Sequence, residues 1–111
     1  MSSFDVVKEI VNLAGNMAAL KNELAGFSKS FQIKPSDGSP YYVDIKDGVM
    51  NLREGEMTGA SATVSATDQV LSDVFTGKTD AVKAFMQGQL KVSGDVFSAQ
   101  KLTRIISKIR K

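Results

Sequence analysis

Hydrophobic and polar residues alternate along this chain with two periods, one typical of helices and the other typical of strands. Residues 4–14 place their large apolar side chains on one side of a helix, and Ser3 precedes them as a potential N-cap. Gly15-Asn16 interrupts this pattern, which then resumes up to Gly26. These features predict two consecutive helices, or one kinked helix, before Gly26.

After Gly26 the period shortens to two residues, which is the spacing of half-buried strands. Asp47-Gly48 separates two of these segments and is a strong signal for a two-residue hairpin. The predicted strands cover residues 27–34, 41–46, 50–53, 60–67 and 90–93.

The stretch from Phe75 to Leu102 contains the end of one helix, a short second helix, a strand and the start of a final helix. Gly77 is placed to end the first helix, and Thr79 can cap the second. Gly88 ends the short helix, and Asp95 can cap the final one. Because the apolar side chains of these elements face one way, the helices are predicted to cover a sheet.

The other face of the predicted sheet is almost wholly polar. The side chains assigned to it include Gln32, Asp44, Thr63 and Lys91. Antiparallel sheets tolerate water on one side, so helices need to cover only the apolar face. The pattern therefore predicts one α+β domain with two layers, over residues 1–111.

Several of these segments also resemble a known family. The segments Thr76–Lys78, Ala84–Asp95, Lys101–Leu102, Val7–Ile10 and Tyr42–Gly48 are similar to the signature of the sterol carrier protein type-2 domain, the nonspecific lipid-transfer proteins. The resemblance implies a five-stranded, mostly antiparallel sheet in which a crossover brings the fourth strand beside the first. It also implies a hydrophobic tunnel under the helices that takes fatty acids, acyl-coenzyme A, sterols and phospholipids.

Ligand-binding residues follow partly from this resemblance and partly from the predicted helix faces. The resemblance implies a lining role for Phe75, Phe85, Met86, Leu90, Val92 and Leu102. Val82, Ile105 and Ile106 are added because they share the inward face of their helices. The alternative for each of these side chains is ordinary core packing.

Small side chains are frequent in the predicted apolar layer. Ala60, Ala62 and Ala66 face inward on the fourth predicted strand, and the opposing helices add further alanines. Facing alanines either allow close approach of a helix or leave space for a ligand.

The final helix combines an apolar face with a basic flank. Residues 96–111 contain five cationic side chains and no acidic one, although the whole chain has a formal charge of only +2. Phe97 projects beside Lys101, Arg104 and Lys108 on this flank. Such a surface suits transient docking on an anionic membrane or a partner enzyme. The alternative is a solvated cationic face that interacts favourably with the helix dipole.

The composition lacks side chains on which many catalytic mechanisms depend. The chain has no histidine and no cysteine, so we expect no imidazole base, no thiolate nucleophile, no metal site and no cofactor. Residues 72–79 half-match a phosphate-binding loop, but the preceding segment is predicted to be helical, whereas that motif needs a strand. The small net charge gives no reason to expect nucleic-acid binding.

Targeting signals also bear on the expected location. No apolar run approaches the ~20 residues that a membrane helix needs, and the first ten residues lack the features of a signal peptide. Peroxisomal relatives end in a Ser-Lys-Leu-like tripeptide, whereas this chain ends in Ile109-Arg110-Lys111. We therefore expect a cytoplasmic protein.

Two functions remain open at this point. The first is a small non-enzymatic carrier that holds a fatty acyl chain, acyl-coenzyme A, a sterol-like molecule or another elongated apolar ligand between helices and sheet. The second is an accessory module with little cavity of its own, which docks a partner enzyme or presents lipid to it.

Overall fold

The protein is described here by a computed structural model, which covers residues 2–14 and 26–109. The predicted break at Gly15-Asn16 and the apolar stripe that follows it lie outside the described residues. The elements are α1 (Ser3–Ala14), β1 (Lys29–Pro35), β2 (Tyr41–Lys46), β3 (Val49–Glu54), β4 (Ala62–Ala66), α3 (Asp68–Phe75), α4 (Ala81–Met86), β5 (Lys91–Gly94) and α5 (Val96–Ile109).

The five strands form one mixed sheet in the order β3-β2-β1-β4-β5. The pair β1 and β4 is parallel, with Phe31 opposite Ala62, and the other three pairs are antiparallel. This order confirms the mostly antiparallel sheet with its fourth strand beside its first. The fourth strand begins later than predicted, at Ala62, so that Ala60 lies outside the sheet.

The turn between β2 and β3 confirms the predicted hairpin. Asp47 has a φ of 54° and Gly48 has a φ of 79°, so both central residues adopt left-handed backbone. Two-residue hairpins with this geometry match the twist of the flanking strands, and Asp-Gly adopts it at little steric cost. The turn fixes the register in which Ile45 faces Met50.

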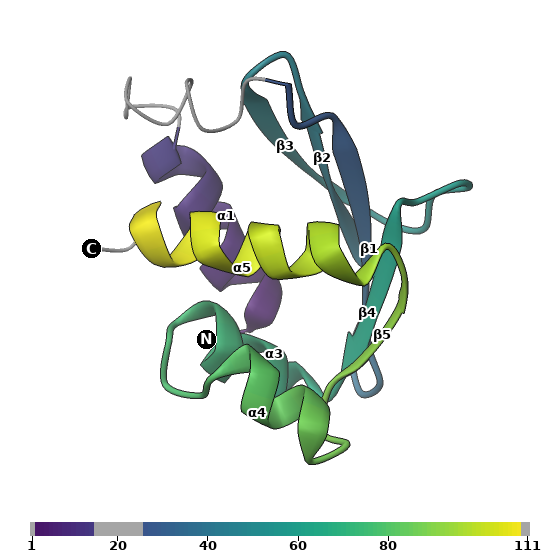
Figure 1. The fold of residues 1–111 in the computed structure, drawn as a ribbon, viewed down its shortest axis with the longest axis vertical. Helices are drawn as coiled ribbons and strands as arrows, with labels where there is room; N and C mark the ends of the chain where they lie inside the picture. Colours follow the sequence, from purple (N-terminus) through teal and green to yellow (C-terminus); the bar gives the residue numbers. More distant parts are fainter. Residues whose placement is uncertain (1, 15–25, 110–111) are drawn as a thin grey trace.

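The helices lie on one face of the sheet, as Figure 1 shows for α1, α3, α4 and α5. The inward side chains of the central strands are fully buried beneath them, among them Phe31, Ile33, Val43 and Ile45. Burial of such apolar side chains contributes roughly 1.5–3 kcal/mol each. The predicted two-layer α+β architecture is therefore confirmed.

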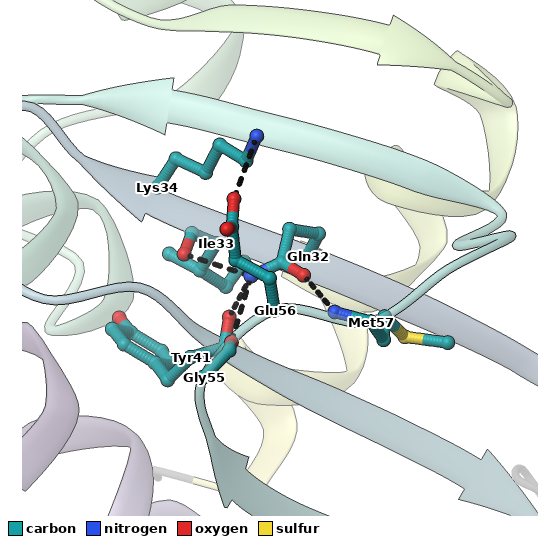
Figure 2. Close-up of polar contacts among 7 residues, drawn as sticks. All are labelled: Gln32, Ile33, Lys34, Tyr41, Gly55, Glu56 and Met57. Carbon is teal, nitrogen blue, oxygen red and sulfur yellow. Dashed lines mark hydrogen bonds and ion pairs between the residues drawn. The ribbon is translucent and has the colours of Figure 1, made fainter.

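Gln32 was predicted to lie on the solvated face, and this prediction is wrong. Its side chain is only 2% exposed, because the segment after β3 folds over it. Figure 2 shows the Gln32 amide donating to the carbonyl oxygens of Tyr41 at 2.9 Å and Gly55 at 3.1 Å. Its Oε1 accepts the backbone N–H of Met57 at 2.7 Å. One side chain thus satisfies backbone groups of a loop that leaves the sheet.

Two helix caps lie one residue away from their predicted positions. Ser2, rather than Ser3, caps α1, because its Oγ accepts the N–H of Asp5 at 3.1 Å. Asp80, rather than Thr79, caps α4 by accepting the N–H of Val82 at 2.8 Å. In both cases the structure uses a neighbouring polar residue whose side chain reaches the first turn.

Asp95 caps α5 as predicted. Its carboxylate accepts the backbone N–H of Ser98 at 3.1 Å and the Ser98 hydroxyl at 2.6 Å, and it pairs with Lys29 at 3.4 Å. The two bonds from Ser98, with a smaller contribution from Lys29, hold the pKa of this carboxyl below its usual value.

Gly94 joins β5 to this cap in left-handed backbone, with a φ of 88°. A Cβ at this position would lie 2.6 Å from the carbonyl oxygen of Ser61. The same oxygen accepts the N–H of Asp95 at 2.8 Å. Close approach of the two backbones therefore requires glycine here.

Candidate ligand-binding cavity

A cavity of about 530 Å³ lies between the sheet and α3, α4 and α5. Its floor is a row of three residues, Ile33 on β1, Val64 on β4 and Val92 on β5, which are direct neighbours across the sheet. The volume falls within the range of roughly 300–1,000 Å³ that is usual for small-molecule sites.

The walls come from the helices that frame β5 in the sequence. The α3 wall includes Leu71 and Phe75, the α4 wall includes Ala81, and the α5 wall includes Ala99 and Leu102. The side chains of Ala81 and Ala99 are small, so space remains between the helices and the floor of the cavity. The complete lining is Ile33, Val64, Leu71, Val74, Phe75, Gly77, Thr79, Asp80, Ala81, Val82, Phe85, Leu90, Val92, Val96, Ala99, Gln100, Leu102, Thr103 and Arg104.

The cavity reaches the surface beside α4. Val82 and Phe85 line it and are nevertheless 51% and 44% exposed. Both side chains therefore expose apolar surface to water at this opening. An apolar ligand in the cavity would cover that surface.

Six of the nine predicted ligand-binding residues line this cavity: Phe75, Val82, Phe85, Leu90, Val92 and Leu102. The other three do not line it. Met86 ends α4 with its side chain 78% exposed, whereas Ile105 and Ile106 are buried in the hydrophobic core one turn beyond Leu102.

The four predicted docking residues of α5 differ in their surroundings. Phe97 is 84% exposed. The Lys101 ammonium lies 4.6 Å from the centroid of the Phe27 ring, a distance at which a cation and an aromatic face attract each other. Arg104 lines the cavity. Lys108 belongs to α5, but its side chain lies outside the described part of the chain.

The sequence prediction missed the polar part of the lining. Gln100, Thr103 and Arg104 line the cavity from the side of α5 that also carries Val96. The spacing of three and four residues that joins these positions is the signal that could have identified them as one face.

The described residues provide neither a metal site nor a membrane-spanning helix. Within residues 2–14 and 26–109, no group of three or more histidine, cysteine, aspartate or glutamate side chains could hold a metal ion. Among the helices of these ranges, none has both the length and the apolar character needed to cross a membrane.

Comparison with known proteins gives the family by sequence and the shared fold by structure. Residues 7–107 match the SCP-2 sterol transfer family. The chain is 33% identical over 79 residues to sterol carrier protein 2 from Gallus gallus, covering 68% of this chain and 14% of that protein. It likewise spans only 19% of the length of hydroxysteroid dehydrogenase-like protein 2 from Homo sapiens, to which it is 30% identical over 80 residues.

Solved structures share the fold at lower identity. The solution structure of palmitated SCP2L2 from Aedes aegypti matches with a TM-score of 0.69 at 23% identity, covering 96% of this chain and 95% of that one. A ubiquinone synthesis protein described as UbiJ-SCP2 matches with a TM-score of 0.77 at 15% identity, covering 92% of this chain and 85% of that one. With 101 consecutive residues matched, from 7 to 107, the chain belongs to the SCP-2 sterol transfer family.

Proposed function

We propose that this protein is a small non-enzymatic carrier that holds a fatty acyl chain or another elongated apolar ligand in the cavity between helices and sheet. The observation that carries the proposal is a largely apolar cavity of about 530 Å³ in a member of a sterol transfer family. A palmitated relative with the same fold supports a fatty acyl ligand.

Desolvation of the ligand would supply most of the affinity. Each buried CH₂ contributes about 0.8 kcal/mol, independently of the head group. The floor of Ile33, Val64 and Val92 offers no hydrogen-bonding side chain, so chain length and shape would matter more than polar recognition. A carrier of this kind is expected to accept several classes of lipid.

A non-enzymatic role is supported by the side chains that meet at the cavity. The lining contains the hydroxyl groups of Thr79 and Thr103, but the chain has no histidine to activate a hydroxyl and no cysteine to act as a nucleophile. The carboxylate of Asp80, which also lines the cavity, accepts the Val82 N–H as a helix cap.

Ligand exchange at an anionic membrane surface is part of this proposal. Phe97 is the most exposed large apolar side chain among the described residues, and Lys101 and Arg104 follow it on α5 after four and seven positions. An exposed aromatic with neighbouring cations favours a transient interfacial contact. Co-sedimentation with anionic vesicles should decrease in Phe97→Ser, and equal binding of both proteins would contradict this contact.

Native mass spectrometry of the purified protein tests the carrier proposal. We expect bound lipid, or saturable displacement of the neutral dye Nile red by fatty acids, with affinity that increases with chain length up to the capacity of the cavity. A protein that carries no lipid, and from which no fatty acid displaces the dye, would contradict the proposal.

A further inference from the structure

The polar side chains of the cavity are unevenly distributed. Gln100, Thr103 and Arg104 lie together on α5, whereas the sheet floor and the α3 wall are apolar. On α5 these residues are separated by three and four positions, so they share one helix face. One end of a bound ligand would therefore meet polar groups while its remainder met apolar ones.

Arg104 is the cationic member of this group and has no protein partner within residues 2–14 and 26–109. The two ion pairs recorded there are Lys29 with Asp95 and Lys34 with Glu56, and no hydrogen bond of Arg104 is found in the same ranges. A guanidinium presents five donors in a planar fork that suits carboxylate or phosphate oxygens. Arg104 thus retains its donors for a ligand.

The neighbouring cation on α5 is placed differently. The Lys101 ammonium lies over the Phe27 ring, and Lys101 does not line the cavity. The predicted basic flank is therefore divided, since Lys101 packs on an aromatic ring and Arg104 borders the cavity.

An acidic side chain borders the cavity from another direction. Asp80 lines it at the start of α4, and its Oδ1 accepts the N–H of Val82. No ion pair joins Asp80 to Arg104. An anionic head group would be repelled by Asp80 and attracted by Arg104, so the two charges together favour one orientation over the reverse.

We propose that the cavity holds a single-chain amphiphile with its anionic head group at Arg104 and its alkyl chain over the Ile33, Val64 and Val92 floor. The inference rests on the proposed carrier function and adds the class of head group and its position. A carboxylate, as in a free fatty acid, and a phosphate monoester, as in a lysophospholipid, both provide the oxygens that a guanidinium binds.

Competition for Nile red by ligands of matched chain length tests this inference. Palmitate, hexadecyl phosphate and uncharged hexadecanol are compared on the wild type, Arg104→Gln, Arg104→Lys and the control Arg53→Gln. Arg53 is an exposed residue of β3 that does not line the cavity, so its replacement makes the same charge change elsewhere. Thermal unfolding of each variant verifies that it is folded.

The measured quantity is the preference for an anionic ligand over hexadecanol. We expect Arg104→Gln to lower this preference about two- to fivefold, the range typical of an exposed ion pair, with hexadecanol binding unchanged. Arg104→Lys should retain part of the preference, and Arg53→Gln all of it. About 1 M NaCl, which shortens the Debye length to about 3 Å, should lower the wild-type preference towards that of Arg104→Gln.

Loss confined to palmitate would identify the carboxylate as the head group, and loss confined to hexadecyl phosphate would identify the phosphate. Equal preferences in Arg104→Gln and Arg53→Gln would overturn the inference while leaving the carrier proposal standing. The inference would also be overturned, with the carrier proposal still standing, if Arg104→Gln weakened the binding of hexadecanol as much as the binding of palmitate. Failure of every ligand to displace the dye from the wild type would overturn both.

Discussion

The hydroxyl of Ser3 donates a 2.6 Å hydrogen bond to the carboxylate of Asp68, 65 positions away in the sequence. The backbone N–H of Ser3 also lies 3.2 Å from both oxygens of that carboxylate. The Tyr41 hydroxyl completes the group by donating to Ser3 Oγ at 2.8 Å. These bonds join the first turns of α1 and α3 to β2 beneath the helices. They also give the buried hydroxyls of Ser3 and Tyr41 their hydrogen-bond partners.

Replacement of Ser3 by alanine tests this group. The change leaves the buried Tyr41 hydroxyl without its acceptor, and we expect the free energy of unfolding to fall by about 1–3 kcal/mol. Tyr41→Phe should cost less, about 0.5–1.5 kcal/mol, because Ser3 keeps its bond to Asp68. Urea unfolding of both single variants and the double variant gives the coupling energy. Strictly additive losses would show that the two hydroxyls do not act together.

The ionisation of Tyr41 should be linked to unfolding at alkaline pH. Burial, with a smaller contribution from the charge of Asp68, raises the pKa of the Tyr41 hydroxyl above its usual value. The folded state therefore holds this proton more tightly than the unfolded state. The stability that results is fully present below the unfolded pKa of about 10 and is lost as the pH rises above it.

Tyrosinate absorbance measures this linkage in Tyr42→Phe, where Tyr41 is the sole remaining tyrosine. We expect its absorbance change to coincide with the loss of circular dichroism as the pH is raised. Ionisation of Tyr41 near pH 10 in a protein that is still folded would contradict its burial.

Replacement of Gln32 by alanine should release the loop that follows β3. The variant loses the amide bonds to Tyr41 and Gly55 and the acceptor for Met57, so we expect a loss of about 1–3 kcal/mol in urea unfolding. Thr63→Ala is the matched control, because Thr63 is the register partner of Gln32 on β4 and lies half-buried beside it. Equal effects of the two changes would mean that the Gln32 amide contributes nothing specific.

Replacement of Gly94 by alanine should destabilise the protein more than the same change at Gly59. Both glycines have positive φ, so each variant pays about 1–2 kcal/mol for left-handed backbone. Only at Gly94 does the new Cβ approach another backbone atom, the Ser61 oxygen, since nothing lies within 4 Å of a Cβ at Gly59. We expect a larger decrease in melting temperature for Gly94→Ala, and similar decreases for the two variants would argue against the close contact.

Replacement of Ala99 by phenylalanine should fill part of the cavity. Loss of space for even two CH₂ groups, at about 0.8 kcal/mol each, would weaken palmitate binding roughly tenfold or more. The unfolding free energy should stay equal or increase by up to about 2 kcal/mol, as is common when a cavity is filled. Ala60→Phe adds the same side chain outside the cavity and should leave binding unchanged. Unaltered binding in Ala99→Phe would place the ligand elsewhere.

Local patterns predicted the elements well, because alternation and turn chemistry act over a few residues. Asp47-Gly48 favours a two-residue hairpin because both residues adopt left-handed backbone readily, and period-two segments assign one face of each strand. Alternation does not say which strand lies beside which, so the place of the fourth strand beside the first followed from family resemblance and not from pattern. The parallel register of Phe31 with Ala62 comes from the structure alone.

The same limit explains why the pattern did not place some individual side chains. Gln32 alternates as a polar outward residue, and its burial depends on a loop that begins at Gly55, 23 positions later. When α5 is considered alone, Arg104 lies on its flank. Its position in the cavity lining depends on how the other helices, including α4, pack around the cavity. Met86 is apolar in the right segment, yet its position at the last turn of α4 leaves it exposed.

The parallel pair at the centre of the sheet has a consequence for how quickly the native state is reached. Each hairpin can form from nearby residues. The pairing of Phe31 with Ala62, in contrast, requires closure of a long stretch of chain, and the conformational entropy of that stretch is lost before the stabilising contacts form. Doubling the length of a flexible connection costs only about 0.6 kcal/mol at equilibrium. Extra residues inserted between β3 and β4 should therefore delay folding through the closure step while the folded state remains nearly as stable.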